Sequence, residues 1–174
     1  MFTIEDISTN VAAYDEIMQA VADIETIVQP HDAWTYQTLA TLLEQDSMKL
    51  LVVYDKKQGD SSVANACIDD NETNSQLVGY CLYQVLFEQA EILRIGTHPD
   101  YQRQGIASQL FEELTAQLKR SQVVHLLLEV RADNAPAIAL YEQQAFAIIH
   151  RRKGYYQRSG QSAIDALIMQ RVYD

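Results

Sequence analysis

The apolar positions at the start of the chain predict a strand followed by two helices. Residues 2–6 are expected to form a short strand, and Asn10 is placed to cap a helix over residues 10–26. Pro30 interrupts the pattern, and a second helix is predicted from residues 31–34 to about residue 45. The apolar residues of the first helix share helical spacing: Val11, Tyr14, Ile17, Met18, Val21 and Ile24. Those of the second are Leu39, Leu42 and Leu43.

The next apolar segments have the length and composition of strands. Residues 48–54 predict one strand, and residues 77–89 and 90–97 are expected to form two more that pair. The polar stretch at residues 56–76 is rich in Gly, Ser, Asp and Asn, which is typical of an exposed loop between antiparallel strands. This loop is longer than most such connections, so it is either functional or an insertion, and we favour an insertion.

The second half of the chain alternates helices and strands. Residues 102–107 form a turn that opens a helix, a nearly continuous apolar strand follows at 123–130, and another helix is predicted at 135–142. Two final strands complete the pattern: residues 147–150 and 163–172. The chain has 174 residues, and this order predicts one α/β domain over residues 1–174.

The turn at residues 102–107 has features of a phosphate-binding site. The first turn of a helix has backbone N–H groups without partners and a partial positive charge, and both suit a phosphate. Gly105 lacks a side chain that would keep a phosphate away, Ala107 is nearly as small, and Arg103 adds a positive charge. This signal is weak by itself. Because the sequence has neither a dinucleotide-binding nor a phosphate-loop motif, we expect a different phosphate cradle.

Charge and composition argue against several classes of function. The net charge of −11 argues against direct nucleic-acid binding. It weakly favours a cationic partner such as an amine or a basic peptide, although solubility alone explains it. No apolar run approaches the roughly 20 residues of a membrane span, and residues 1–6 lack the features of a signal peptide. Cys67 and Cys81 provide too few ligands for a metal site and do not favour a disulfide, so we expect no metal and a cytoplasmic setting.

A series of motifs follows in a specific order from residue 92 onward. They are Ile92–Thr97 with the turn at 102–107, then Leu128-Glu129-Val130-Arg131, Asn134, Ala137–Glu142, Arg151-Arg152 with Tyr155-Tyr156, and Asp165–Met169. This order resembles the GNAT N-acetyltransferase superfamily and, within it, the ribosomal-protein N-terminal alanine acetyltransferases (RimI type). The resemblance is strong from about residue 78 and diffuse before it.

The resemblance implies a fold, an activity and a co-substrate. The fold is the GNAT acyl-CoA N-acyltransferase fold, with a mixed, mostly antiparallel twisted sheet of about seven strands and about four flanking helices. The activity is acetyl transfer from acetyl-CoA to the N-terminal α-amine of a protein, by resemblance the N-terminal alanine of small-subunit ribosomal protein eighteen. We expect direct attack in a ternary complex, because no Ser or Cys has the surroundings of a covalent nucleophile.

The resemblance also assigns residues to the cofactor. Backbone N–H groups of the turn are expected to bind the CoA pyrophosphate, and the preceding strand to pair with the pantetheine arm. A backbone N–H at the end of that strand is expected to face the thioester carbonyl. The residues expected to bind acetyl-CoA are Ile95, Gly96, Thr97, Arg103, Gln104, Gly105, Ile106, Ala107, Ser108 and Asn134.

Two residues are candidates for proton transfer. The resemblance assigns Glu129 the role of general base, and partial burial at the end of an apolar strand is expected to raise its proton affinity. Its alternatives are an ion pair with Arg131 or an exposed strand end. The resemblance favours Tyr141 as the acid that protonates the leaving thiolate; it follows Asn134 by two helical turns, so both side chains are expected on one face. Its alternative is a core tyrosine.

Four positions depart from the pattern of the subfamily. Ala107 stands where a second glycine is commoner, which the superfamily tolerates. Arg94 replaces a small polar residue, and its side chain is expected near the acceptor cleft. Ala145 replaces a glycine, so the turn after its helix is expected to differ. Gly154 replaces an asparagine, which leaves the shape of the acceptor pocket open.

Several alternatives stay open at the level of the sequence. Trp34 is either a core or hinge aromatic, which we favour, or a substrate contact. His125 is expected to be a satisfied core histidine, and His98 to be structural or exposed. The acceptor is alternatively a small amine or a lysine side chain. A third possibility is a catalytically silent module that binds CoA. The sequence says nothing about the oligomeric state.

Overall fold

The fold is a single seven-stranded sheet with helices on both faces. The computed structural model describes residues 1–7, 13–56, 75–157 and 162–173. The strand order is β1-β2-β3-β4-β5-β7-β6, and every neighbouring pair is antiparallel except β4 and β5. The elements are β1 (Phe2–Ile7), α1 (Tyr14–Val28), α2 (Tyr36–Leu43), β2 (Met48–Lys56), β3 (Ser75–Leu86), β4 (Gln89–Thr97), η1 (Pro99–Tyr101), α3 (Ile106–Arg120), β5 (His125–Arg131), α4 (Ala135–Gln143), β6 (Ala147–Tyr156) and β7 (Ile164–Val172). The predicted sheet architecture is therefore confirmed.

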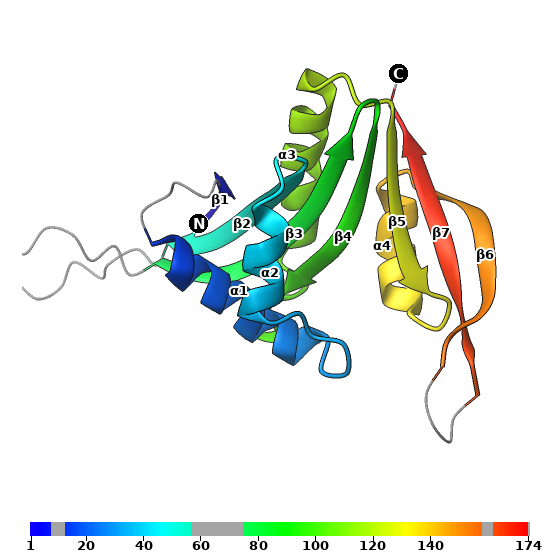
Figure 1. Ribbon diagram of the computed structural model, residues 1–174, viewed down its shortest axis with the longest axis horizontal. Helices are drawn as coiled ribbons and strands as arrows, with labels where there is room; N and C mark the ends of the chain where they lie inside the picture. Colours follow the sequence, from blue (N-terminus) through cyan, green and yellow to red (C-terminus); the bar gives the residue numbers. More distant parts are fainter. Residues whose placement is uncertain (8–12, 57–74, 158–161, 174) are drawn as a thin grey trace, which may run out of the picture.

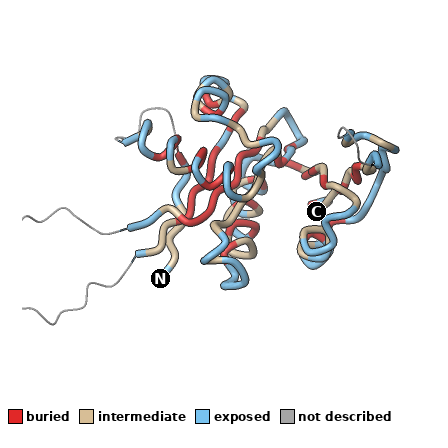
Figure 2. Tube along the Cα trace, turned by 90° about the horizontal axis from the view of Figure 1, so that it is seen from below, coloured by how far each residue is buried: buried red, intermediate tan, exposed pale blue. Residues whose placement is uncertain are grey.

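The two faces of the sheet carry separate hydrophobic clusters. Helices α1 and α2 cover one face, and α3 and α4 lie on the other (Figure 1). Alternation along β2 illustrates this: Leu51 and Val53 join the cluster under α3, whereas Leu50 and Val52 join the one under α1. The buried residues concentrate in the middle strands (Figure 2). In the described ranges, no helix has both the length and the apolar composition of a membrane span.

The two N-terminal helices begin later than the sequence pattern predicted. Helix α1 starts at Tyr14, and the predicted cap Asn10 lies outside the described residues. Helix α2 starts at Tyr36 rather than at residues 31–34, so that prediction was wrong. The hydroxyl of Thr35 accepts the Thr38 N–H at 3.3 Å and caps α2, which is a local signal that the apolar pattern does not contain.

Strand ends also differ from the prediction. The chain turns at residues 87–88, so the first strand of that hairpin ends at Leu86 and not at residue 89. At the C-terminus, residues 151–156 belong to β6 instead of connecting two strands, because pairing with β7 continues past two irregularities in register. Of the predicted loop at 56–76, residues 57–74 lie outside the described part of the chain, as does Cys67; Cys81 is buried and free.

The turn after α4 has the usual conformation, although the sequence suggested that Ala145 in place of glycine would alter it. Ala145 adopts the left-handed conformation itself, with φ 64°, and its N–H donates to the backbone carbonyl of Glu142 at 3.0 Å. The next N–H, of Phe146, donates to the carbonyl of Tyr141 at 3.0 Å, which matches the usual helix ending with glycine. Phe146 is thereby placed in the core beside Tyr141. The ordinary turn is kept at the cost of a strained alanine.

We expect Ala145→Gly to stabilise the protein, because glycine adopts a positive φ without the steric penalty of alanine. The gain should be about 1 kcal/mol in the free energy of unfolding, measured by urea denaturation. The matched control is Ala139→Gly inside α4, which should lose about 1 kcal/mol because glycine disfavours a helix interior. Equal losses in the two variants would contradict the strain at Ala145.

Candidate active site

The central feature of the site is the point where β4 and β5 separate. Their parallel pairing covers only residues 89–92 with residues 125–128. Leu93 is an extra residue in β4 opposite β3, because Ile92 pairs with Tyr83 and Arg94 with Leu82. A bulge of this kind bends a strand and re-aims its side chains. Beyond it β4 leaves β5, and the two strands diverge toward the end that carries α4 (Figure 1).

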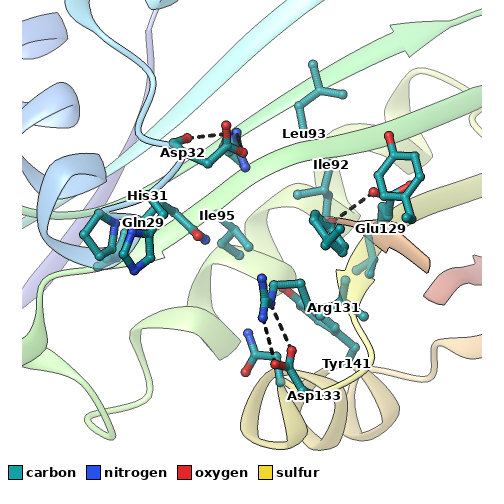
Figure 3. Close-up of a pocket in the computed structure, with 18 of the residues that line it drawn as sticks. Gln29, His31, Asp32, Ile92, Leu93, Ile95, Glu129, Arg131, Asp133 and Tyr141 are labelled. Carbon is teal, nitrogen blue, oxygen red and sulfur yellow. Dashed lines mark hydrogen bonds and ion pairs between the residues drawn. The ribbon is translucent and has the colours of Figure 1, made fainter. Parts of the chain in front are cut away.

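A cavity of about 750 Å³ occupies this divergence. Its walls come from residues 92–95 of β4 and 128–131 of β5, with Asn134 and Tyr141 from the region of α4. The segment 28–32 after α1 and residues 155–157 at the end of β6 complete the lining. Figure 3 shows Asp32 and His31 on one side of this cavity and Glu129 and Arg131 on the other. Four predicted site residues thus meet here: Ile95, Glu129, Asn134 and Tyr141.

Glu129 is held by two donors from β6. The Tyr156 hydroxyl donates to Oε1 at 3.0 Å, and Nη1 of Arg152 donates to Oε2 at 2.9 Å. These side chains reach across β7, which lies between β5 and β6. A cation and a hydroxyl donor thus both contact this carboxylate. The side chain is 21% exposed, and it therefore faces the cavity without being free in solvent.

The ion pair between Glu129 and Arg131, which was one alternative to the role of general base, is not formed. Arg131 instead donates through Nε and Nη2 to both carboxylate oxygens of Asp133, at 2.9 and 2.8 Å. Its guanidinium also lies 5.4 Å from the ring centroid of Tyr156. The turn after β5 brings the Asp133 carboxylate within reach of Arg131. The spacing of Glu129 and Arg131 along the strand did not predict this partner.

Tyr141 combines a core ring with a hydroxyl group at the cavity. Its ring packs against Phe111 and Phe146, with centroid distances of 6.1 and 5.9 Å. The side chain lines the cavity, and its hydroxyl has no hydrogen-bond partner among the described residues. Burial raises the pKa of Tyr141 to about 12. The phenol is consequently neutral at physiological pH and holds a proton that it can donate.

Asn134 is positioned by capping α4. Its Oδ1 accepts the N–H of Ala137 at 3.3 Å, and the helix begins at the next residue. Its side-chain nitrogen makes no hydrogen bond to the part of the chain that the structure describes. Asn134 and Tyr141 both line the cavity, as expected for side chains two turns apart. An amide donor and a phenol donor therefore lie on the same wall.

The turn before α3 is built to leave N–H groups unpaired. Arg103 and Gly105 have positive φ values of 61° and 83°, and Gly105 caps α3 without a side-chain hydrogen bond. The side chain of Gln104 donates to the carbonyl of Asp100 at 3.1 Å and holds the turn together. Residues of positive φ on either side of a residue of negative φ are typical of turns that bind anions through backbone N–H groups. This local geometry fits a phosphate.

The predicted cofactor residues differ in how they are placed. Ile106 is buried in the core, so only its backbone faces outward. At Gly105 a Cβ would meet only Gln109, at 4.0 Å, so the positive φ and not crowding requires glycine there. At Gly96 a Cβ would lie 2.7 Å from the ring of Tyr80, so this glycine admits the tyrosine. The residues that do not line the cavity are Gly96, Thr97, Arg103, Gln104, Gly105, Ile106, Ala107 and Ser108.

A buried carboxylate that the sequence pattern did not reveal lies next to Arg94. Glu25 on α1 is 0% exposed, and its oxygens accept the Tyr80 hydroxyl and, at 3.0 Å, the N–H of Trp34. An acidic residue within the apolar stripe, one position after Ile24, was the available signal. Arg94 completes this group, and Trp34 lies beneath its guanidinium at 4.4 Å from the ring centroid. Trp34 is thus part of a packed cluster.

The histidines are placed as follows. Nδ1 of His98 accepts the N–H of Asp100 at 3.3 Å, so His98 is structural, as predicted. His125 was expected to be satisfied, and this was wrong for one atom: its Nδ1 is buried without a partner in the described ranges. Neither residue lines the cavity.

Comparison with known families agrees with this geometry. The profile of the acetyltransferase (GNAT) family matches residues 21–146, which is most of the chain. The chain belongs to the GNAT acetyltransferase family. The matched residues include β4, α3 and β5, which are the elements that border the divergence.

Individual GNAT relatives narrow the comparison. Ribosomal protein bS18-alanine N-acetyltransferase of Escherichia coli K12 is 41% identical over 96 residues, which are 55% of this chain and 64% of the relative. The aligned part is therefore just under two thirds of that relative's length. The crystal structure of the ribosomal-protein-S18-alanine N-acetyltransferase from Escherichia coli has a TM-score of 0.73 at 29% identity, covering 98% of this chain and 92% of that one. Arabidopsis thaliana NAA60 in complex with acetyl-CoA shares the fold, with a TM-score of 0.75 at 17% identity and coverage of 99% and 98%.

The raised pKa of Tyr141 predicts a loss of stability at alkaline pH. The folded state favours the neutral phenol, so the contribution of Tyr141 to the free energy of unfolding is complete below about pH 10. That contribution is lost as the pH rises through about 12. Tyr141→Phe should therefore lose less stability across this range, by about 2 kcal/mol at its upper end. Urea unfolding of both proteins at several pH values tests this, and parallel pH profiles would contradict it. Other buried tyrosines remain in both proteins, so only the difference is informative.

Proposed function

We propose that this chain transfers an acetyl group from acetyl-CoA to the N-terminal α-amine of a protein, with the N-terminal alanine of ribosomal protein bS18 as the expected acceptor. The proposal is supported by family membership and by the names of the relatives described above. The observation that carries it is the meeting of Glu129 and Tyr141 at one cavity between diverging strands. An acceptor of this kind would place the reaction in the cytoplasm.

The residues suggest how the reaction would proceed. Acetyl-CoA supplies an activated thioester carbon, which the neutral amine attacks directly. Glu129 would accept the proton that the ammonium loses, directly or through a water molecule. Tyr141 would give its proton to the departing thiolate and recover one, directly or through water, from the attacking nitrogen, which loses its second proton as the amide forms. Its high pKa keeps the phenol protonated until the thiolate departs. The bond between carbonyl carbon and sulfur breaks as the new amide bond forms, so no acyl-enzyme is needed.

The co-substrate would be held at both ends of the divergence. The edge of β4 at residues 95–97 that faces away from β3 has no strand partner among the described residues and would pair with the pantetheine arm as an added strand. The N-terminus of α3, with no side-chain cap at Gly105, would accept the pyrophosphate. The side-chain nitrogen of Asn134 would donate to the arm near its reactive end. The side-chain nitrogen of Asn134 and the N-terminus of α3 have hydrogen-bonding capacity that the described protein contacts do not use.

The direct test is release of thiol from acetyl-CoA with defined acceptors. Peptides with a free N-terminal alanine should be acetylated, whereas a blocked peptide containing lysine and a polyamine should not. Glu129→Gln should lower kcat by about a hundredfold or more, with binding of acetyl-CoA kept, because the carboxylate acts on the proton only. Glu142→Gln, at an exposed position on α4, is the matched control and should retain activity. Turnover of the polyamine or the blocked peptide would overturn the proposed acceptor, and CoA binding without any turnover would favour a silent module.

The phosphate-binding turn predicts an effect on the co-substrate alone. Arg103 is exposed at the N-terminus of α3, so Arg103→Gln should raise KM for acetyl-CoA about fivefold at low salt, and less at high salt. The matched control is Arg120→Gln at the other end of α3, whose side chain is 70% exposed. An equal change in the two variants would indicate a general charge effect and contradict a specific role for the turn.

A further inference from the structure

Arg94 links the wall of the cavity to the body of the protein. Its Nη2 donates to the carboxylate of Asp32 at 2.7 Å and to the backbone carbonyl of the same residue at 3.2 Å. Its Nε lies 3.9 Å from Oε2 of the buried Glu25 and has no hydrogen-bond partner among the described residues. Trp34 packs against the guanidinium from one face. One side chain of β4 thus holds the segment that follows α1.

This contact lies on the wall of the cavity that residues 28–32 and β4 form. Asp32 and Arg94 both line the cavity, and Figure 3 shows Asp32 on the side opposite Glu129. Asp32 is 72% exposed, whereas Arg94 is only 17% exposed. The carboxylate is therefore the group that an acceptor reaches more easily, and the guanidinium lies behind it. The turn at residues 102–107, which is expected to bind the cofactor, does not line this cavity.

The charge that an acceptor meets at this wall depends on Asp32 and Arg94 together. A carboxylate on this wall would attract a cationic side chain of the acceptor, but the guanidinium at 2.7 Å cancels most of that attraction. Removing Arg94 would leave Asp32 negative, and removing the charge of Asp32 would leave Arg94 facing Glu25 alone. Exposed ion pairs are worth less than about 1 kcal/mol, so the effect on the acceptor should be several-fold.

We propose that Arg94 is a specificity-determining residue that neutralises Asp32 and so prevents the cleft from selecting acceptors by the charge of their second residue. The inference rests on the proposed function, because it requires a peptide whose N-terminal residue reaches Glu129. A peptide residue spans at most about 3.5 Å, so the second residue of such a peptide would still lie within reach of the cavity walls.

The test is a cycle of charge variants with three peptides. The peptides begin Ala-Arg, Ala-Gln or Ala-Glu and are otherwise identical, and kcat and KM are measured with saturating acetyl-CoA. Arg94→Gln should raise the preference for Ala-Arg over Ala-Glu about fivefold, and Asp32→Asn should shift it about fivefold the other way, both through KM. The double variant should return to the native ratio, because both charges are gone. Arg94→Lys should keep the native ratio, since it retains the charge without the fork of the guanidinium.

The outcomes separate this inference from the proposed function. If the native protein acetylates Ala-Gln but neither single variant changes the ratio, Arg94 does not set specificity and the proposed function stands. A shift in Arg94→Gln that persists in the double variant would also overturn the inference, because Asp32 would not be its source. If no peptide is acetylated by the native protein, both proposals fail. Asp32→Asn alters an exposed side chain, so it tests the inference even if Arg94→Gln unfolds.

Discussion

The structure depends on the divergence of β4 from β5. Four residue pairs hold the two strands together, and the bulge at Leu93 then turns β4 away. Beyond that point the facing edges of both strands have backbone groups without a strand partner. Such groups need hydrogen bonds, and a strand-like ligand can supply them. The cavity, the exposed edge of β4 and the direction of the chain toward α3 all follow from this one irregularity.

Charged side chains around this cavity form pairs of opposite charge, although the chain as a whole is strongly acidic. Asp32 pairs with Arg94, Glu129 with Arg152, and Arg131 with Asp133. These three pairs place cations beside the carboxylates, so the local balance differs from the net charge of −11. A lining of paired charges keeps the side chains in fixed positions, which matters where groups must approach within hydrogen-bond distance.

Backbone strain appears at the ends of helices that border the site. Arg103 and Ala145 are both in the left-handed region, before α3 and after α4. Ala145 lets Phe146 pack beside Tyr141, and Arg103 shapes the turn that leaves the N-terminus of α3 uncapped. Neither residue type favours this conformation, so tertiary packing must supply the compensation. The glycine expected after α4 proved unnecessary for the turn.

The sequence by itself determined the strand and helix order, because periodicity is local information, and its resemblance to the GNAT superfamily brought Glu129, Asn134 and Tyr141 into one hypothesis. It could not place the partners of Glu129, since Arg152 and Tyr156 lie 23 and 27 residues away and reach it across another strand. It likewise missed the contact of Arg94 with Asp32, 62 residues apart. The start of α2 was missed because a capping hydroxyl, and not apolar spacing, decides it. Only the tertiary structure determines which charged side chains meet, because contacts depend on distance in space and not on separation along the sequence.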